Sequence, residues 1–587
     1  MITYSLKCLD KMAEDLSYVN LFDIFLGHGE RTAIEYKLDN EVRKISFAQM
    51  ENPVKYVADN LMVKLDGMPK GFVALKLDNC PEWPIIFWGI MMAGFKPFLL
   101  DYRHNEQLTQ FLLKQAGAVA IISAERENTN SEAISVLAEE VIVCDKRKIY
   151  ELAKELKAEG SYKERIRAYS WGDEVALCTS GTTNTAKIYT YDGTAIGHQV
   201  LSARQTVMEN ERIMSDREVK NLAFLPLHHI FGFLACYIWY SFFAGALVFA
   251  SGKAPSALLS TCREHKVTHM LAVPLLVNNI VSGLQRKLAK ESKIKQIGFK
   301  TMCGISLFVQ RISPERGIAF AKKIFRKSVL ENLVGTSLEV IICGGGHVLP
   351  NSLKVINAIG YYTICGFGMT EVGVSSVDRA YSIKRRRSGC VGVPVDSIEY
   401  KLVPSNSTGE AKGNVGELQI RGESVHSGRM VDGIRMPRQV DENGWFKTGD
   451  IGRLENGALY IEGRVKEVII NESGENVYPD ELEDKFTSLE GINQFTVMGV
   501  KKSADSIYEN ITLVLETSNE INDREYIGRL LEQVNAANSM LPVFKKISSI
   551  LITKEALPLS NGIKVKRTEI KRQLESDSES MKYIKIK

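Results

Sequence analysis

The chain has 587 residues, of which 45% are hydrophobic and 25% are charged. Its 74 basic and 70 acidic side chains leave a formal net charge of only +4, which gives no reason to expect a nucleic-acid partner. This composition is ordinary for a globular protein. The length exceeds what one hydrophobic core usually supports, so a single domain is excluded and at least two are expected.

The N-terminal part of the chain alternates short apolar strands with helical patterns. Met1 to Leu16 lacks a continuous apolar stretch, so no secretory signal is expected. The alternation indicates βαβ units, and therefore an α/β fold of parallel-rich sheets flanked by helices. Strands are predicted over Phe72–Leu77, Val119–Ile122, Asn221–Leu225 and Thr268–Val273, with a helix after Pro84.

A run of hydroxyls, glycine and a terminal cation follows the predicted buried strand Glu174–Cys178. Because the run leaves the end of a sheet, its backbone N–H groups are able to form an anion-binding nest. It is not a Walker loop, since Ala186 and Ile188 stand where that pattern requires glycine and serine or threonine. The run predicts a polyphosphate site, with a surface turn as the alternative. It comprises Thr179, Ser180, Gly181, Thr182, Thr183, Asn184, Thr185, Ala186 and Lys187.

The segment Ile230–Ala250 carries no charge and approaches the roughly 20 apolar residues that span a bilayer. It is interrupted by small residues and divides into a helix near Gly232–Phe243 and a strand near Ala246–Phe249. Continuous apolar runs are also typical of buried elements in α/β proteins, so we expect no transmembrane segment. The tail Lys582–Lys587 is basic, and each lysine near an anionic lipid surface contributes roughly 1 kcal/mol of binding free energy, which would give only marginal peripheral membrane contact. The alternative is a frayed terminus.

The rest of the chain contains a basic helical region and a C-terminal unit of its own. Residues Leu284–Leu330 are rich in lysine and arginine at helical spacing, which predicts a solvated helical insertion. We place a domain boundary at Val465 and Lys466, giving a large domain over residues 1–465 and a small α/β domain over residues 466–587. No low-complexity linker separates them, which indicates a short hinge. The small domain is predicted to hold strands near Phe495–Val500, Ile511–Leu515 and Ser549–Thr553.

The ten cysteines form no CxxC pair and show no Cys/His spacing suited to zinc. Several lie in apolar runs, namely Cys178, Cys236 and Cys343. We therefore expect reduced core thiols in a cytoplasmic protein.

Five further motifs follow the hydroxyl-rich run in a fixed order. They are Gly344–Gly346 after the strand Leu338–Ile342, Gly366–Glu371 after Tyr362–Ile364, Trp445–Asp450, Gly463–Glu467 and Pro558–Lys564. Together they resemble the AMP-forming acyl-CoA synthetases, the family that also holds luciferases and peptide-synthetase adenylation domains. The resemblance runs from about Asn79 to Lys571. The basic insertion resembles those of the fatty acyl-CoA ligase branch and favours that branch. The resemblance implies a large N-terminal domain and a small, mobile C-terminal domain.

The resemblance implies a site for ATP and magnesium. Thr370 would contact the α-phosphate, Glu371 would hold the magnesium ion and Phe367 would stack on adenine. Asp450 would accept hydrogen bonds from the ribose, and Arg464 would reach the ribose or a phosphate. The alternative for Phe367 is a core phenylalanine, and the alternative for Asp450 and for Arg464 is a structural salt bridge. The full ATP-binding set is Thr179, Ser180, Gly181, Thr182, Thr183, Lys187, Gly345, Gly366, Phe367, Gly368, Thr370, Asp450 and Arg464.

The resemblance also implies groups for the acid and the thiol. The acid pocket would be lined by His229, Phe231, Gly344, Gly345 and Gly346. Lys564 would be the catalytic cation between carboxylate and α-phosphate, acting with Thr370 and His229. Lys466 would be the hinge, and Gly474 would leave room for a pantetheine arm. The chain departs from the family pattern at Asn184, where glycine is usual, and at Ile563, which intervenes before the lysine.

A carboxylate is a poor acylating agent because its leaving group is oxide, and joining it to AMP supplies a better one. We expect a magnesium-requiring ligase that activates a medium- or long-chain fatty acid with ATP and transfers it to CoA. One alternative is a stand-alone enzyme that loads an acyl, amino or aryl acid onto the pantetheine of a carrier protein. Another is an inactive nucleotide-binding homologue. The basic cluster Lys384–Arg387 is a candidate contact for the phosphate of CoA or for an acidic carrier.

Overall fold

The chain folds into two compact units in a computed structural model. The structure describes residues 3–126, 132–141, 145–155, 161–179, 186–214, 216–252, 254–404, 414–470, 476–487, 489–501, 509–560, 564–575 and 582–586. The first unit takes in residues 1–345, 353–399 and 421–446, and the second takes in residues 346–352, 400–420 and 447–587. The predicted boundary at Val465 and Lys466 lies inside the second unit and stays a prediction.

The first unit contains a nine-stranded sheet with a parallel centre. Six adjacent strands, from β13 to β1 in sheet order, run parallel, and antiparallel strands flank them at both edges. In sheet order the strands are β15 (Val393–Pro394), β14 (Gly373–Val377), β13 (Tyr362–Met369), β12 (Val340–Cys343), β11 (His269–Ala272), β9 (Lys220–Leu222), β10 (Ala246–Val248), β1 (Thr32–Leu38) and β2 (Glu41–Ser46).

A second, eight-stranded sheet completes the strands of the first unit. Its strands β7, β4, β3, β5 and β6 run parallel, while β8, β18 and β19 continue the sheet antiparallel. In sheet order the strands are β19 (Ile434–Met436), β18 (Gly428–Val431), β8 (Ile188–Asp192), β7 (Glu174–Cys178), β4 (Lys96–Leu99), β3 (Phe72–Lys76), β5 (Ala118–Ser123) and β6 (Ile134–Leu137). The prediction of parallel-rich sheets is confirmed.

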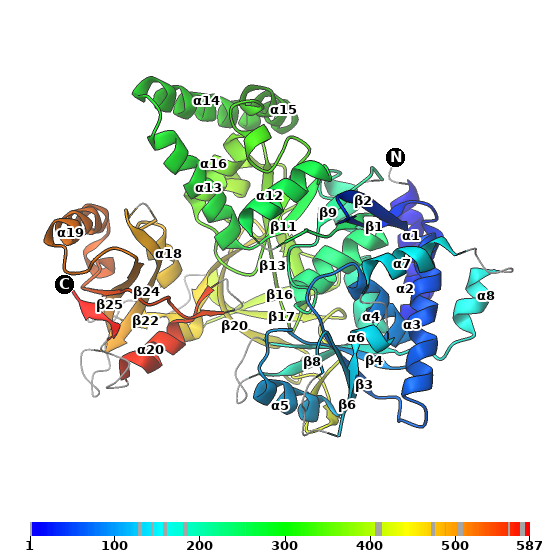
Figure 1. The fold of residues 1–587 in the computed structure, drawn as a ribbon. Helices are drawn as coiled ribbons and strands as arrows, with labels where there is room; N and C mark the ends of the chain where they lie inside the picture. Colours follow the sequence, from blue (N-terminus) through cyan, green and yellow to red (C-terminus); the bar gives the residue numbers. More distant parts are fainter. Residues whose placement is uncertain are drawn as a thin grey trace. The chain divides into compact units, whose positions relative to one another are not determined.

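Helices surround both sheets (Figure 1). They are α1 (Thr3–Glu14), α2 (Tyr18–Gly27), η1 (Ala48–Met50), α3 (Glu51–Lys64), α4 (Glu82–Met92), α5 (Glu106–Ala116), α6 (Ala138–Val141), α7 (Lys146–Lys154), α8 (Tyr162–Arg167), α9 (Gly193–Leu201), α10 (Arg204–Glu209), η2 (Phe231–Trp239), α11 (Tyr240–Phe242), α12 (Pro255–Glu264), α13 (Pro274–Ala289), α14 (Lys293–Ile312), α15 (Pro314–Phe325), η3 (Leu330–Asn332), α16 (Pro350–Ala358) and α17 (Ile383–Arg387). The end of α13 together with α14 and α15 covers the predicted basic region Leu284–Leu330, so its helical structure is confirmed, while its being an insertion stays a prediction.

The uncharged segment Ile230–Ala250 lies inside the first unit. It forms η2, which is a π-helix, then α11 and the strand β10, and almost all of its side chains are buried. Gly232 is required there, since a Cβ at this position would lie 2.0 Å from the carbonyl oxygen of Pro226. None of the helices in the described residues is long and apolar enough to cross a membrane.

The second unit is built mainly from the last third of the chain. A four-stranded sheet contains β16 (Ile398–Val403), β17 (Val415–Gly422), β20 (Phe446–Glu455) and β21 (Ala458–Arg464). Another contains β24 (Ile492–Lys501), β25 (Glu509–Thr517), β26 (Ser549–Thr553) and β29 (Ile584–Lys585). Two short pairs are β22 (Ile469–Ile470) with β23 (Asn476–Val477) and β27 (Leu559–Ser560) with β28 (Lys564–Val565). The helices are η4 (Val465–Glu467), α18 (Pro479–Glu483), α19 (Arg524–Ser539), η5 (Val543–Lys545) and α20 (Arg567–Glu575).

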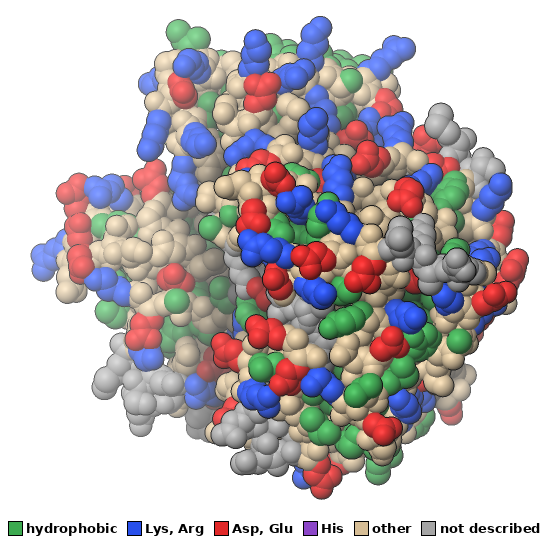
Figure 2. Space-filling view, turned by 45° about the vertical axis from the view of Figure 1, so that its right-hand side comes forward, with side chains coloured by type: hydrophobic (Ala, Val, Ile, Leu, Met, Phe, Trp, Pro, Cys, Tyr) green, Lys and Arg blue, Asp and Glu red, His purple; other side chains and the backbone are tan. Residues whose placement is uncertain are grey.

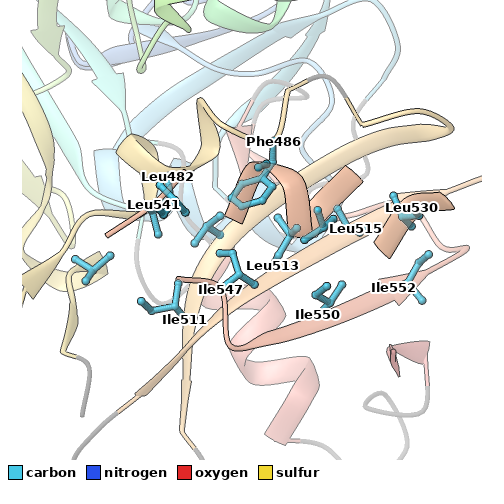
Figure 3. Close-up of a cluster of buried hydrophobic side chains, with 14 of the residues drawn as sticks. Leu482, Phe486, Ile511, Leu513, Leu515, Leu530, Leu541, Ile547, Ile550 and Ile552 are labelled. Carbon is cyan, nitrogen blue, oxygen red and sulfur yellow. The ribbon is translucent and has the colours of Figure 1, made fainter. Parts of the chain in front are cut away.

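A continuous apolar core holds the C-terminal sheet and its helices together (Figure 3). Alternate residues of β25 and β26 point to the same side of the sheet, as the two-residue period of a strand requires. They meet side chains of α18 and α19, and ten labelled members of this cluster are Leu482, Phe486, Ile511, Leu513, Leu515, Leu530, Leu541, Ile547, Ile550 and Ile552. The sequence placed strands near all three of β24, β25 and β26, which the structure confirms.

Arg567 fixes the start of α20 through a buried ionic network. Its guanidinium donates to Glu467 and Asp480, to Glu483 Oε1 at 2.7 Å and to Thr496 Oγ1 at 3.0 Å. Burial lowers the pKa of Arg567, but the three carboxylates outweigh it and hold the pKa well above its usual value. A buried cation held by several acceptors is costly to remove, because its partners then stay buried without a countercharge.

We predict that Arg567→Met lowers the free energy of unfolding of the second unit by about 3–5 kcal/mol. The matched control is Arg572→Met on the same helix, since Arg572 is exposed and paired with Glu569. Loss of that surface pair is expected to cost below about 1 kcal/mol. Urea unfolding followed by circular dichroism measures both variants, and equal midpoints for the two would contradict the assigned role of Arg567.

Burial keeps several histidines of the first unit neutral, among them His28, His269 and His426. Burial lowers the pKa values of His28, His269 and His426 to about 4. Each ring has a hydrogen-bond partner, for example Arg212 O at 2.8 Å from His269 Nε2. In the unfolded chain the histidine pKa returns to about 6.5, so unfolding takes up protons between pH 4 and pH 6.5.

We therefore predict that these histidines stabilise the fold fully above pH 6.5 and progressively less as the pH falls toward 4. The variant His426→Gln removes one such group, so its unfolding free energy should depend less on pH than that of the parent chain in this window. The difference should reach about 3 kcal/mol near pH 4, because the pKa of His426 is about 4 in the folded chain and about 6.5 in the unfolded chain. Urea unfolding at several pH values measures it, and parallel curves would refute it.

Candidate active site

The predicted polyphosphate loop joins two antiparallel strands, β7 and β8. Backbone contacts close its base: the Thr179 N–H donates to Lys187 O at 2.9 Å, and the Lys187 N–H donates to Thr179 Oγ1 at 3.0 Å. Because β7 runs parallel to β4, the hairpin leaves the carboxyl edge of the eight-stranded sheet, where ligands bind in open α/β sheets. Lys187 is exposed there. Ser180, Gly181, Thr182, Thr183 and Asn184 lie outside the described residues.

A glycine turn follows β12 at the carboxyl edge of the nine-stranded sheet. Gly345 has a φ of +79°, in the left-handed region that favours glycine. A Cβ on Gly344 would lie 3.0 Å from Phe231 Cζ, so the missing side chain makes room for that aromatic ring. The turn therefore approaches η2 closely, and Gly344 and Gly345 are brought together with Phe231 as predicted. Gly346 belongs to the second unit.

The second glycine motif lies within a strand and does not form a loop after one. Strand β13 continues from Tyr362 through Met369, and residues 366–369 pair antiparallel with β14. A Cβ on Gly368 would lie 2.4 Å from Gly373 O, and one on Gly366 would lie 2.9 Å from Ser376 O. Close backbone approach thus explains these glycines, and residues 366–369 extend the strand that begins at Tyr362.

Thr370 and Glu371 follow β13 directly. Thr370 is buried, and its carbonyl oxygen accepts a 2.8 Å hydrogen bond from the hydroxyl of Tyr191 on β8. Glu371 is partly exposed, and its carbonyl oxygen accepts from the His426 N–H at 3.2 Å. These two bonds fix the backbone of the pair between the two sheets, so the positions of Thr370 and Glu371 are set by the fold.

An apolar pocket opens between η2 and the carboxyl ends of β11, β12 and β13. The space in it that the centre of a water molecule can occupy is about 60 Å³, which is below the roughly 300–1,000 Å³ typical of small-molecule sites, so the pocket is narrow. Phe367 contributes to its wall together with His229 and Gly344. The apolar lining comes from Ile213, Met214, Ile230, Phe231, Ala235, Trp239, Tyr240, Leu271, Ile342, Val374 and Val377.

The protonation state of His229, a polar group in the wall of this pocket, follows from its surroundings. Burial lowers its pKa to about 4, with the neighbouring His228 lowering it further, so the ring is neutral at pH 7. The Phe231 N–H donates to His229 Nδ1 at 3.4 Å, which leaves the proton of the neutral ring on Nε2. His229 is thus a hydrogen-bond donor without charge, suited to a carboxylate oxygen.

A buried acidic group stands beside His228. His228 Nε2 lies 3.5 Å from Asp101 Oδ2, and Arg103 Nη2 lies 2.7 Å from the same oxygen. Burial raises the pKa of Asp101, but hydrogen bonds from His228 and Arg103 outweigh it and hold the pKa well below its usual range. The sequence analysis missed Asp101, although its place directly after the apolar run Phe98–Leu100 marks the end of a strand.

Asn79 holds the histidine segment against the other sheet. Its side-chain amide donates to Ala223 O at 3.0 Å and to Leu225 O at 2.7 Å, and its Oδ1 accepts from the Leu227 N–H at 2.9 Å. Asn79 follows β3, whereas the segment that it holds follows β9. This side chain thereby joins the carboxyl edges of the two sheets and positions the His228–His229 pair.

The remaining predicted residues lie in the second unit. Asp450 on β20 is buried and pairs in register with Arg464 on β21, whose Nε donates to Asp450 Oδ1 at 3.1 Å. The structure therefore shows the salt bridge that was the alternative for these two residues. The binding of ribose by Asp450 stays a prediction. Lys466 is exposed on η4. Lys564 pairs through its backbone with Ser560 in the short β27–β28 hairpin. Gly474, Ile563 and the Lys564 side chain lie outside the described residues.

The residues fit a magnesium ion shared with phosphate. In the described part of the chain, no group of three or more His, Cys, Asp and Glu side chains gathers that would hold a metal ion. Magnesium is usually bound by one or two carboxylates together with substrate phosphates, so a single carboxylate such as Glu371 is sufficient.

The basic cluster Lys384–Arg387 is largely committed to internal contacts. Arg386 is buried, donates to Gln310 Oε1 at 3.0 Å and stacks 4.6 Å from the centre of the Tyr362 ring. Arg385 Nη2 lies 2.7 Å from Asp378 Oδ1. Two of its guanidinium groups therefore serve the fold, while Lys384 and Arg387 are exposed, and a contact of this cluster with a CoA phosphate or an acidic carrier stays a prediction.

Comparison with known proteins identifies the family of this chain. Residues 25–428 match the family model described as AMP-binding enzyme. The long-chain-fatty-acid–CoA ligase of Salmonella typhimurium is 25% identical over 527 residues, covering 82% of this chain and 83% of that protein. A chloroplastic long-chain-fatty-acid–[acyl-carrier-protein] ligase of Arabidopsis thaliana is 24% identical over 550 residues, covering 80% and 73%.

A solved structure shows the same fold at low identity. The o-succinylbenzoate coenzyme A synthetase of Bacillus subtilis in complex with ATP and magnesium aligns with a TM-score of 0.65 and 20% identity, covering 94% of this chain and 98% of that one. Its likeness supports the architecture of both units, while the family model covers well over half of the chain. On this ground the chain belongs to the AMP-binding enzyme family.

Proposed function

We propose that the protein activates a carboxylic acid with ATP and then transfers the acyl group to a thiol. In the first step a carboxylate oxygen attacks the α-phosphorus of ATP, the bond to the bridging oxygen breaks and pyrophosphate leaves. In the second step a thiolate attacks the carbonyl carbon of the acyl adenylate, and AMP leaves with the bonding electrons. Each step needs the reacting groups held in line and the developing charge stabilised.

The observation that carries this proposal is the apolar pocket with an uncharged histidine donor in its wall. An apolar acyl group gains free energy in such a pocket, at about 25 cal/mol per Å² of buried surface. His229 orients the carboxylate by a hydrogen bond from Nε2, while Gly344 and Gly345 allow the carboxylate and the nucleotide to approach the backbone closely. The acid's reactive end is thereby directed toward Thr370.

The nucleotide contacts follow from the motifs. Thr179, Ser180, Gly181, Thr182, Thr183 and Lys187 bind the β- and γ-phosphates, Thr370 binds the α-phosphate and Phe367 stacks on adenine. Glu371 would hold a magnesium ion, which would offset the phosphate charge. Asp450 accepts hydrogen bonds from the ribose hydroxyls, and Arg464 reaches the ribose or a phosphate. The Asp450–Arg464 pair must open in part for this, which an exposed arginine side chain permits.

The second step requires different groups at the same adenylate. Lys466 acts as the pivot of the C-terminal domain over residues 466–587, and Gly474 leaves space for a pantetheine arm. Hinges of this kind are a few residues that absorb a change of backbone angles. Lys564 serves the first step only, because it neutralises charge between the carboxylate and the α-phosphate.

We infer that the acid is a medium- or long-chain fatty acid and that CoA is the acceptor. The apolar wall from Phe231 to Tyr240 suits an unbranched chain, and the Salmonella relative is named for such an acid and for CoA. Carrier-protein pantetheine is the second candidate acceptor, because the Arabidopsis relative is named as an acyl-carrier-protein ligase.

We predict ATP–pyrophosphate exchange that depends on magnesium and on an added fatty acid. Ala235→Phe should reduce exchange with long acids at least tenfold more than exchange with short ones, because the new ring occupies the pocket. Ala235→Ser keeps the pocket open and is the control. Exchange with amino or aryl acids alone would favour the carrier-loading alternative. ATP binding without exchange for any acid in the panel would overturn the proposal.

We also predict that Lys564→Ala slows adenylate formation by about 10²- to 10³-fold, as expected for loss of a charge-stabilising donor. Thioester formation from supplied acyl adenylate should be retained. Lys566→Ala, two residues away, is the matched control and should leave both half-reactions near the parent rates. The half-reactions are measured separately by pyrophosphate release and by thioester yield; equal loss of both in Lys564→Ala would refute its assignment.

A further inference from the structure

Helix α14 exposes large apolar side chains along one face, two near its start and three near its end. Ile294, Ile297, Ile305, Phe308 and Ile312 are 83%, 64%, 39%, 63% and 72% exposed. Their spacing of three, four or eight residues places them on one face of the helix, since 3.6 residues make a turn. Single exposed apolar residues are ordinary, but a row along a 20-residue helix marks a contact surface. We call these five residues the α14 stripe.

The opposite face of α14 is firmly attached to the first unit. Ser306 Oγ donates to Ala358 O at 2.7 Å, and Gln310 Nε2 donates to Asn357 O at 2.9 Å. Leu307 packs with Ala358 in a small buried cluster. Since these inner residues hold the helix in place, the α14 stripe faces away from the unit's core and is not simply a poorly packed part of it.

The surroundings of the stripe are strongly basic. From Arg286 to Lys327 the chain has twelve lysines and arginines against two glutamates, a net charge of +10, whereas the whole chain carries +4 and the rest of it therefore carries −6. Eleven of the twelve basic side chains are exposed. Figure 1 shows α14 and α15 side by side, and Figure 2 shows lysine, arginine and hydrophobic side chains gathered in that region.

We propose that the α14 stripe docks this protein onto an anionic lipid surface. An amphipathic helix with an apolar face and lysine-rich flanks lies in the plane of a bilayer interface, where its apolar side chains enter the acyl boundary and its cations meet lipid phosphates. Each lysine or arginine near an anionic surface adds to binding. A second copy of this chain is disfavoured as the occupant, because two surfaces of charge +10 repel each other. The inference does not depend on which acid the enzyme activates.

The test is co-sedimentation of the full chain with vesicles of equal parts phosphatidylglycerol and phosphatidylcholine, compared with vesicles of phosphatidylcholine alone. We expect binding to the anionic vesicles that weakens as salt is raised. The variant Ile297→Gln, Phe308→Gln, Ile312→Gln should bind at least about tenfold more weakly, since its insertion surface is lost. The variant Lys293→Gln, Lys300→Gln, Arg311→Gln should lose a similar factor through charge.

A matched control separates the stripe from exposed apolar surface in general. Val63→Gln, Met208→Gln, Ile434→Gln changes three side chains that are 79%, 60% and 64% exposed elsewhere on the first unit, and it should bind like the parent chain. Parent-level binding by the stripe variant, or no binding of the parent chain to anionic vesicles, overturns the proposal. A parent dimer that the stripe variant converts to a monomer in ultracentrifugation would assign the stripe to a second copy instead.

Discussion

The arrangement of the site depends on hydrogen bonds that join two sheets, made by the side chain of Asn79, by the Tyr191 hydroxyl to Thr370 O and by the His426 N–H to Glu371 O. Asn79, at the end of β3, makes three hydrogen bonds to the backbone that follows β9. Parallel strands end at a common edge, and Asn79 places the edges of the two sheets next to each other. The histidine pair, the glycine turn after β12 and the segment that follows β7 all leave those edges. Topology therefore sets the edge from which each segment leaves, and local sequence supplies its chemistry.

Much of this topology could be predicted from the sequence because the strands are short, apolar and bounded by glycine or polar residues. Strands β7 and β26 were placed to the residue, and β24 and β25 within a few residues at each end. The exception at β13 has a physical cause. Its glycines are there because the backbone of the adjacent strand β14 passes within van der Waals contact of them. Glycine is common both in turns and where two backbones approach closely, so the residue type alone does not separate the two.

The electrostatic features of the site could not be predicted in the same way. The neutral state of His229 follows from burial among apolar side chains that several elements contribute. The low pKa of Asp101 follows from hydrogen bonds with His228 and Arg103, and His228 is far from Asp101 in the sequence. The cluster Lys384–Arg387 shows the converse. Its charge suggested a solvated or ligand-binding surface, but Arg386 completes a buried network with Gln310 and Asn357 that anchors α14.

The wide helix η2 couples the pocket to the core of the first unit. Phe231, Ala235 and Trp239, four residues apart, line the pocket. Tyr237 on the same helix receives a 2.6 Å hydrogen bond from Trp88 Nε1 and packs edge-on against Trp83. Moving the helix to enlarge the pocket would break these buried aromatic contacts, and close-packed interiors resist such changes. Under the proposed function, the range of acids is therefore set by the side chains that η2 presents to the pocket, and the helix itself provides a rigid wall.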